Sequence, residues 1–127
     1  LSLSADWTLG PLLTPLIGDR QSGHTLLRIG PCLLVGFPGD YAGHLATQLA
    51  KAVNQDVDPS VVTVTTSFSG GYDGYLVSQY WHEKRDVYET RLMNFFGPWF
   101  GEYMNELSLE MAKRIYQDTA PDSAEKE

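Results

Sequence analysis

The feature that most constrains the fold is a strand-like run, a helical pattern and a second strand-like run in direct succession. Cys32 to Phe37 is a mostly apolar stretch of strand length, which favours a buried strand. Pro38-Gly39-Asp40 breaks it, and an amphipathic helix pattern follows that should end near Asn54, with Asp40 as its cap. Val61 to Phe68 is the most β-prone segment of the chain. This order predicts two parallel strands joined by a right-handed crossover.

The flanking segments complete one small domain. Thr25 to Ile29 is a further strand candidate, because Gly30-Pro31 forms a turn signal after it. Two helices are expected from Ser78 to about Phe96 and from Trp99 to about Tyr116, with Gly97-Pro98 between them. The sequence therefore predicts an α/β fold, with a small mixed sheet that contains the βαβ unit, helices packed on it and helices at the C-terminal end.

The 127 residues are enough for one domain and too few for two independent cores. We expect a single α/β domain over residues 1–116, in which residues 1–23 lie as irregular chain over the core. Residues 117–127 are polar and charged, which predicts a disordered tail.

Charge and hydropathy exclude two classes of partner. Nine basic residues against sixteen acidic ones give a formal charge of −7, and the basic residues form no patch, so nucleic acid is not expected as a partner. No run of eighteen apolar residues is present, so we expect no transmembrane span. The single cysteine, Cys32, cannot form an internal disulfide, and we expect it to be buried as a small hydrophobic residue.

Acidic and phenolic side chains follow the two strands of the predicted crossover. Asp40 and Tyr41 come after the first, and Tyr72, Asp73 and Tyr75 come after the second, in a loop rich in glycine. Because ligands gather beyond the carboxyl ends of strands in an open α/β sheet, this edge is the predicted site. The glycines fit neither nucleotide-binding fingerprint, so nucleotide binding is not expected.

The residues alone leave the chemistry of this edge open. Asp40 and His44 are spaced so that both could face one metal ion, but a capping aspartate and a histidine on a polar helix face explain the same spacing. Asp40 and Asp73 could form a hydrolytic carboxylate pair, although no spacing rule supports it.

A series of short motifs runs through most of the chain. Their order is Phe37-Pro38-Gly39-Asp40, a helix with Gly43, the β-rich run Val61 to Thr66, Gly71-Tyr72-Asp73-Gly74-Tyr75, Tyr88-Glu89 and Gly97-Pro98. In order and approximate spacing they resemble the later part of the catalytic domain of the neutral/alkaline non-lysosomal ceramidases, over roughly residues 25 to 105. In that family the first strand runs into Pro-Gly-Glu and the next opens into Asn-x-Tyr-x-x-Tyr.

This resemblance implies a zinc-dependent hydrolase that cleaves the amide bond of N-acyl sphingoid lipids. The family's glutamate and first tyrosine are zinc ligands, which by position implies Asp40 and Tyr72 as metal ligands here, with Tyr75 as a substrate contact. The family's ligand histidines and nucleophilic serine lie earlier in its domain. The resemblance therefore also implies that the chain is a portion of a larger domain, partnered by the upstream part of the same protein and inactive alone.

Further expectations follow from this interpretation. Strands that upstream segments normally flank would leave apolar surface uncovered, so the chain could self-associate. The resemblance implies a lipid-like amide substrate and a secreted or membrane-associated location. The alternatives are a ceramidase-like domain that binds or scaffolds without catalysis, and a different amidase or ester hydrolase on the same scaffold.

Overall fold

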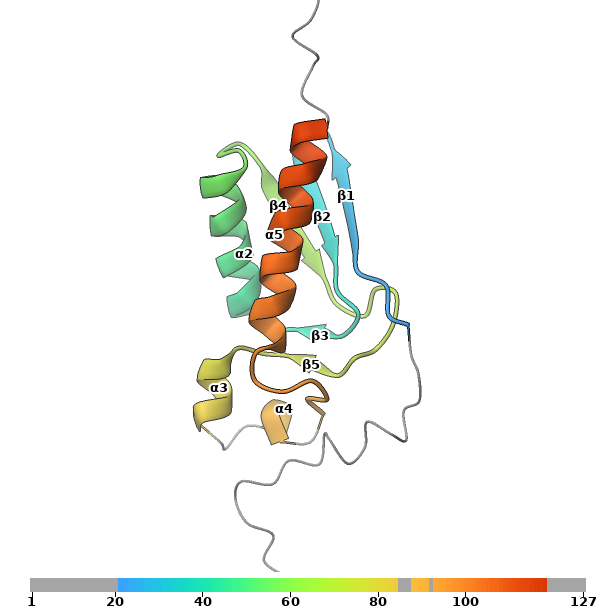
Figure 1. Ribbon diagram of the computed structural model, residues 1–127, viewed down its shortest axis with the longest axis vertical. Coiled ribbons are helices and arrows are strands. Elements are labelled where there is room, and N and C mark those ends of the chain that lie inside the picture. The colour runs from blue at the N-terminus through green and yellow to red at the C-terminus, as the bar shows by residue number, and fades with distance from the viewer. Residues whose placement is uncertain (1–20, 85–87, 92, 119–127) are drawn as a thin grey trace, which may run out of the picture.

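The computed structural model describes residues 21–84, 88–91 and 93–118. The expectations for residues 1–20 and for the tail at residues 119–127 lie outside the described residues. The described chain has the α/β fold that the sequence predicts, with helices against a small mixed sheet (Figure 1).

The main sheet has three strands in the order β1, β2, β4. β1 (Thr25–Ile29) is antiparallel to β2 (Cys32–Gly36), and β2 is parallel to β4 (Val62–Thr66). The turn between β1 and β2 contains Gly30 at a φ of 58°, a conformation that glycine adopts without strain. The parallel pairing of β2 with β4 confirms the strand pairing predicted for the crossover.

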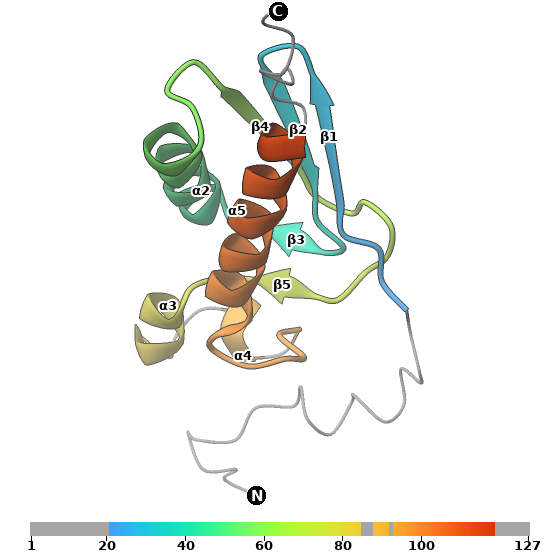
Figure 2. The ribbon, with the colours of Figure 1, turned by 45° about the horizontal axis from the view of Figure 1, so that its top comes forward.

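Two long helices cover one face of this sheet. α2 (Gly43–Asp56) and α5 (Phe100–Asp118) contact each other and lie against the strands, as the two views in Figures 1 and 2 show. Both helices end two residues later than the sequence indicated. The buried core between helices and sheet includes Leu33, Val35, Phe37, Leu45, Leu49, Val53, Met104 and Ala112.

The other face of the sheet carries apolar side chains that no described residue covers. Side chains alternate along a strand, so the residues on either side of each core position point away from the helices. These side chains are Leu27, Ile29, Val62 and Val64, each at least 40% exposed. Cys32 pairs with Ile29 and Val62 on this face, which explains why it is half-buried where the sequence predicted burial.

A second, two-stranded sheet lies beyond the carboxyl ends of β2 and β4. Its strands, β3 (Asp40–Tyr41) and β5 (Tyr75–Leu76), are parallel. Asp40 is therefore a strand residue, and the prediction that it caps α2 is wrong: the N-cap is Ala42, with no side-chain cap bond. The backbone N–H of Asp40 instead donates to the Gly74 carbonyl at 2.9 Å, which keeps the residue in the sheet.

The helix predicted over residues 78–96 is not continuous. The described part forms two short helices, α3 (Gln79–Lys84) and α4 (Tyr88–Arg91), and Asn94 then forms a bridge with Gly74. The Tyr75 N–H donates to the Met93 carbonyl at 2.9 Å, so the segment after α4 runs beside β5. Tertiary pairing overrides helical propensity here. Among the described residues, no helix is long and apolar enough to cross a membrane.

Candidate functional site

The site is built on the short parallel pair of strands β3 and β5. Asp40 pairs with Tyr75 and Tyr41 with Leu76, and the Ala42 N–H donates to the Leu76 carbonyl at 3.1 Å. Because alternate residues of a strand share a face, Tyr41 and Leu76 point into the core while their neighbours face the opposite way. That opposite face is the floor of a cavity.

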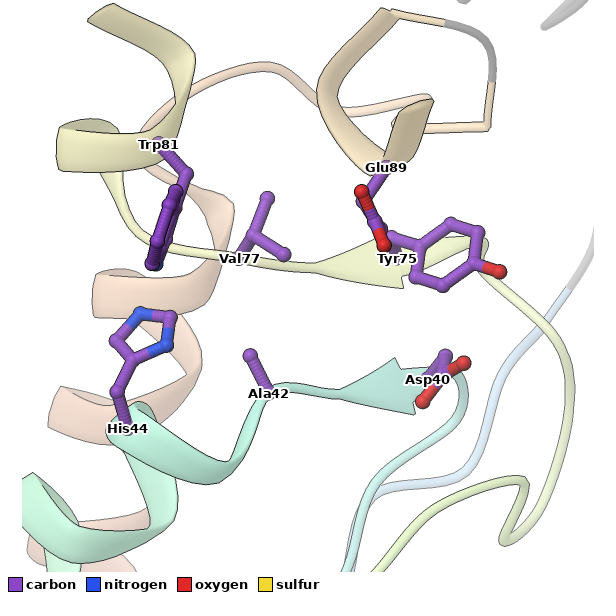
Figure 3. Close-up of a pocket in the computed structure, with 7 residues that line it drawn as sticks. All are labelled: Asp40, Ala42, His44, Tyr75, Val77, Trp81 and Glu89. Carbon is purple, nitrogen blue, oxygen red and sulfur yellow. The ribbon is translucent and has the colours of Figure 1, made fainter. Parts of the chain in front are cut away.

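The cavity has a volume of about 350 Å³ and takes its walls from β3, β5 and three helices. It is lined by Asp40, Ala42, His44, Tyr75, Val77, Trp81 and Glu89. Figure 3 shows these side chains in a graded arrangement, with Asp40, Tyr75 and Glu89 at one end, Ala42 and Val77 in the middle, and His44 and Trp81 at the other end.

Glycines allow the two strands to approach. A Cβ atom on Gly39 would lie 2.4 Å from the Gly74 carbonyl oxygen and 2.5 Å from Leu76 Cδ1. Gly74 itself has a φ of 79°, and a Cβ there would lie 1.9 Å from the Met93 carbonyl oxygen. A side chain at Gly39 would push β3 away from β5, and one at Gly74 would push β5 away from the segment around Met93.

The acidic end combines carboxylates with protonated phenols. Burial raises the pKa of Tyr75, and the negative charges of Asp40 and Glu89 add to the shift. Tyr75 also meets the ring of Tyr88 edge to face, with the ring centroids 5.9 Å apart. With its pKa raised, Tyr75 keeps its proton at neutral pH and can donate a hydrogen bond from its hydroxyl group.

Tyr72 lies outside the cavity lining but within the electrostatic reach of Asp40. Burial raises the pKa of the Tyr72 phenol, and the Asp40 charge is the next largest cause. The Tyr72 ring stacks on Phe68 at a centroid distance of 5.7 Å. Of the three predicted site residues, Asp40 and Tyr75 thus share the cavity, and Tyr72 lies beside them.

The opposite end of the cavity is aromatic. The rings of His44 and Trp81 tilt against each other, with centroids 6.2 Å apart. Trp81 is held in place by α3, whose Gln79 N–H donates to Glu102 Oε1 on α5 at 3.0 Å. His44 Nε2 is buried and has no hydrogen-bond partner among the described residues.

The geometry bears on two hypotheses that the sequence left open: a carboxylate pair of Asp40 and Asp73, and a metal ion held by Asp40 and His44. Asp73 lies away from the cavity lining, buried, and its carboxylate accepts a hydrogen bond from the Ser22 hydroxyl at 2.5 Å, so its role is to hold the loop. His44 and Asp40 do line one cavity, but they lie at its opposite ends (Figure 3). The described residues contain no group of three or more His, Cys, Asp or Glu side chains that could hold a metal ion.

Sequence reasoning missed Val77, Trp81 and Glu89. The two-residue spacing from Tyr75 to Val77 was a usable signal, because it places both side chains on one strand face. Glu89 belongs to the Tyr-Glu motif of the family resemblance, so that motif could have identified it. Trp81 had no comparable signal, since no motif or spacing in the sequence singles it out.

Comparison with solved structures supports the resemblance at the level of the fold. The chain is similar to the neutral ceramidase from Pseudomonas aeruginosa, with a TM-score of 0.61 and 19% sequence identity over 75% of this chain. The matched region spans 15% of the length of that ceramidase. No protein-family model and no curated protein sequence matches the chain.

Proposed function

We propose that this chain forms part of a ceramidase-like, zinc-dependent hydrolase site that cleaves the amide bond of N-acyl sphingoid lipids. Asp40 and Tyr72 would contact the metal, and Tyr75 would contact the substrate. The upstream part of the same protein would supply the ligand histidines and the nucleophile. The observation that carries the proposal is the fold shared with a neutral ceramidase, combined with the Asp40 carboxylate and the Tyr75 phenol at one end of the cavity and the Tyr72 phenol beside it.

The donor chemistry of these residues fits zinc in part. Zinc binds carboxylate oxygens at about 2.0–2.2 Å, and most protein zinc sites use three or four protein ligands. Asp40 and a Tyr72 phenolate would supply two oxygen ligands. The raised pKa of Tyr72 reflects burial and the neighbouring Asp40 charge, and a bound cation would oppose the effect of that charge.

The chain's own side chains suggest a division of tasks. A zinc ion, when bound, polarises an amide carbonyl and so favours attack on its carbon. Tyr75 keeps its proton and could donate a hydrogen bond to a polar group of the substrate beside Asp40. Ala42, Val77 and Trp81 would exclude water from the apolar part of the substrate.

Zinc affinity of the full-length protein is the test. The zinc dissociation constant is measured by isothermal titration calorimetry for the unmodified protein and for Asp40→Ala and Tyr72→Phe. Loss of one of four ligands should weaken binding by at least about tenfold in each variant, because each removes a direct metal contact. Tyr103→Phe and Glu106→Gln, on the exposed side of α5, are matched controls that should retain full affinity.

An unchanged zinc affinity in both site variants would contradict the proposal. That result would favour the alternative of a ceramidase-like domain that binds or scaffolds without catalysis. If both variants lose zinc, hydrolysis of a panel of N-acyl lipids, other amides and esters then identifies the bond that is cleaved.

A further inference from the structure

Six exposed aromatic side chains gather at one end of the molecule. They belong to α3, to α4 and to residues 96–106, which lead into α5, and these segments lie together beyond β3 and β5 (Figures 1 and 2). We call them the aromatic patch: Tyr80, Trp81, Tyr88, Phe96, Trp99 and Tyr103. Apolar surface gathered in this way marks a contact with a protein or with a membrane.

A rigid turn presents two of these rings. The side chains of Phe96 and Trp99 are 53% and 61% exposed. Gly97, between them, has a φ of 85°, which favours glycine, and its N–H donates to Asn94 Oδ1 at 2.7 Å. The ring of Phe96 also meets the ring of Phe100, with the centroids 4.6 Å apart. Because the turn is already held in place, binding through Phe96 and Trp99 costs little further ordering.

Charged side chains lie among the rings of the aromatic patch. Among the described residues of these segments, the exposed charged ones are two acidic and two basic residues: Glu83, Lys84, Arg91 and Glu106. Lys84 Nζ lies 4.7 Å from the centroid of the Tyr80 ring. The core of a protein interface is depleted in charge, whereas the boundary between water and lipid accommodates Trp and Tyr rings together with long charged side chains. This mixture therefore favours a lipid surface over a protein partner.

The balance of charge indicates which kind of lipid surface fits. The exposed charges of the patch segments cancel, and the whole chain has a formal charge of −7. An anionic lipid surface repels a chain of this charge, because binding to such lipids depends on clustered Lys and Arg side chains. A zwitterionic surface, such as phosphatidylcholine, carries no net charge, so contact with apolar rings supplies the attraction there.

The aromatic patch borders the cavity. Trp81 belongs to both, and Glu89, which lines the cavity from α4, follows Tyr88 in the chain. The ring of Tyr88 meets the ring of Tyr75 edge to face. Figure 3 shows Trp81 on α3 and Glu89 on α4, at the wall of the cavity opposite β3. A lipid surface bound to the patch therefore lies next to the cavity.

We infer that the aromatic patch docks on a zwitterionic phospholipid surface, with Phe96 and Trp99 inserted among the headgroups. The contact itself depends neither on zinc nor on hydrolysis. Its purpose rests on the proposed function: a lipid substrate would pass from the surface into the neighbouring cavity without exposing its apolar chain to water.

The test measures how the full 127-residue chain partitions onto phosphatidylcholine vesicles in buffer containing a metal chelator. Phe96→Ser and Trp99→Ser should each lower the partition coefficient by about tenfold, because each removes an apolar ring from the contact. Val62→Ser removes an exposed apolar side chain from the main sheet instead, so it is the matched control and should bind as the unmodified chain does. Vesicles that also contain phosphatidylserine should bind less tightly than phosphatidylcholine alone.

A second measurement locates the inserted ring without relying on a polar substitution. Bromine atoms on the lipid acyl chains quench the fluorescence of a tryptophan that lies close to them. Bromine-labelled phosphatidylcholine vesicles should quench the unmodified chain. Trp99→Phe keeps an aromatic ring, so it should still bind the vesicles but lose most of the quenching. Circular dichroism checks that each variant keeps its fold.

The absence of binding to phosphatidylcholine vesicles would overturn the inference. Undiminished binding by Phe96→Ser and Trp99→Ser, tighter binding to vesicles with phosphatidylserine, or unchanged quenching in Trp99→Phe would overturn it as well. The zinc titration of the Asp40 and Tyr72 variants is independent of these measurements. Vesicle binding together with an unchanged zinc affinity in those variants would leave the lipid contact standing and remove the proposed hydrolase, and the converse results would do the opposite.

Discussion

At the scale of single residues, the histidines His44 and His24 differ in role because their side chains have different surroundings. His44 lines the cavity, whereas His24 joins the sheet to α5: its Nδ1 donates to the Gly36 carbonyl at 3.0 Å, and its Nε2 lies 2.9 Å from Ser108 Oγ. The His24 ring also packs on Phe37 at a centroid distance of 4.9 Å. No local sequence pattern marks His24 for this role, because its partners Gly36 and Ser108 are distant along the chain.

The environment of His24 predicts a pH dependence of stability. Burial lowers the pKa of His24 below 6.5, and the bond to Gly36 opposes this only in part. The unfolded chain therefore binds a proton more readily than the folded one. The contribution of His24 to the free energy of unfolding is therefore present above pH 6.5. It should be lost as the pH drops through that value towards the lowered pKa of His24 in the folded state.

The measurement is the free energy of unfolding by urea between pH 5 and pH 8. His24→Gln should reduce the slope of stability against pH over the acidic part of this range. Part of the slope should remain, because burial also lowers the pKa of His82. An identical slope in the variant would show that His24 does not contribute.

At the scale of elements, the buried side chain of Asn94 ties the segment after α4 to β5, α3 and the start of the turn at Gly97. Asn94 Nδ2 donates to the Tyr75 carbonyl at 3.1 Å, and the Gly97 N–H donates to Asn94 Oδ1 at 2.7 Å. Asn94 Nδ2 also lies 3.1 Å from His82 Nε2 on α3. Hydrogen bonds of one side chain thus connect the described residues after α4 with both neighbouring elements.

Asn94→Ala should therefore destabilise the protein. The substitution leaves the Gly97 N–H and the Tyr75 carbonyl without this partner, at a cost of about 2–3 kcal/mol in the free energy of unfolding. Asn54→Ala, exposed near the end of α2, is the control, and an equal loss in both variants would contradict the role of Asn94.

At the scale of the whole molecule, one face of the main sheet is apolar and is not covered by any described residue. This face carries Leu27 and Ile29 of β1 at one edge and Val62 and Val64 of β4 at the other. Cys32 and Leu34 of β2 lie between the two pairs. A contiguous apolar face of this kind favours association. Self-association of the chain, expected from the sequence, stays a prediction. This face is the surface through which we expect the association to occur.

Sedimentation velocity over a range of concentrations measures that association. The unmodified chain should form larger species as its concentration rises, and the double variant Val62→Lys, Val64→Lys should shift them to the monomer, because it places two like charges on the face. Circular dichroism checks that the variant keeps its fold. A chain that is monomeric at every concentration would contradict the prediction.

The elements that could be predicted from the sequence are those whose signals are local. β1, β2, α2, β4 and α5 follow from apolar periodicity and from the turn residues between them, and the parallel pairing of β2 with β4 follows from their order along the chain. The family resemblance also came from local motifs, and the shared fold with a neutral ceramidase supports it.

The pairing of β3 with β5 could not be predicted from the sequence, because two-residue strands have too little pattern to be recognised and form only where distant segments meet. That pairing makes Asp40 a strand residue rather than a helix cap. It also gathers Val77, Trp81 and Glu89 around the cavity, since their shared position depends on contacts between segments far apart in the sequence.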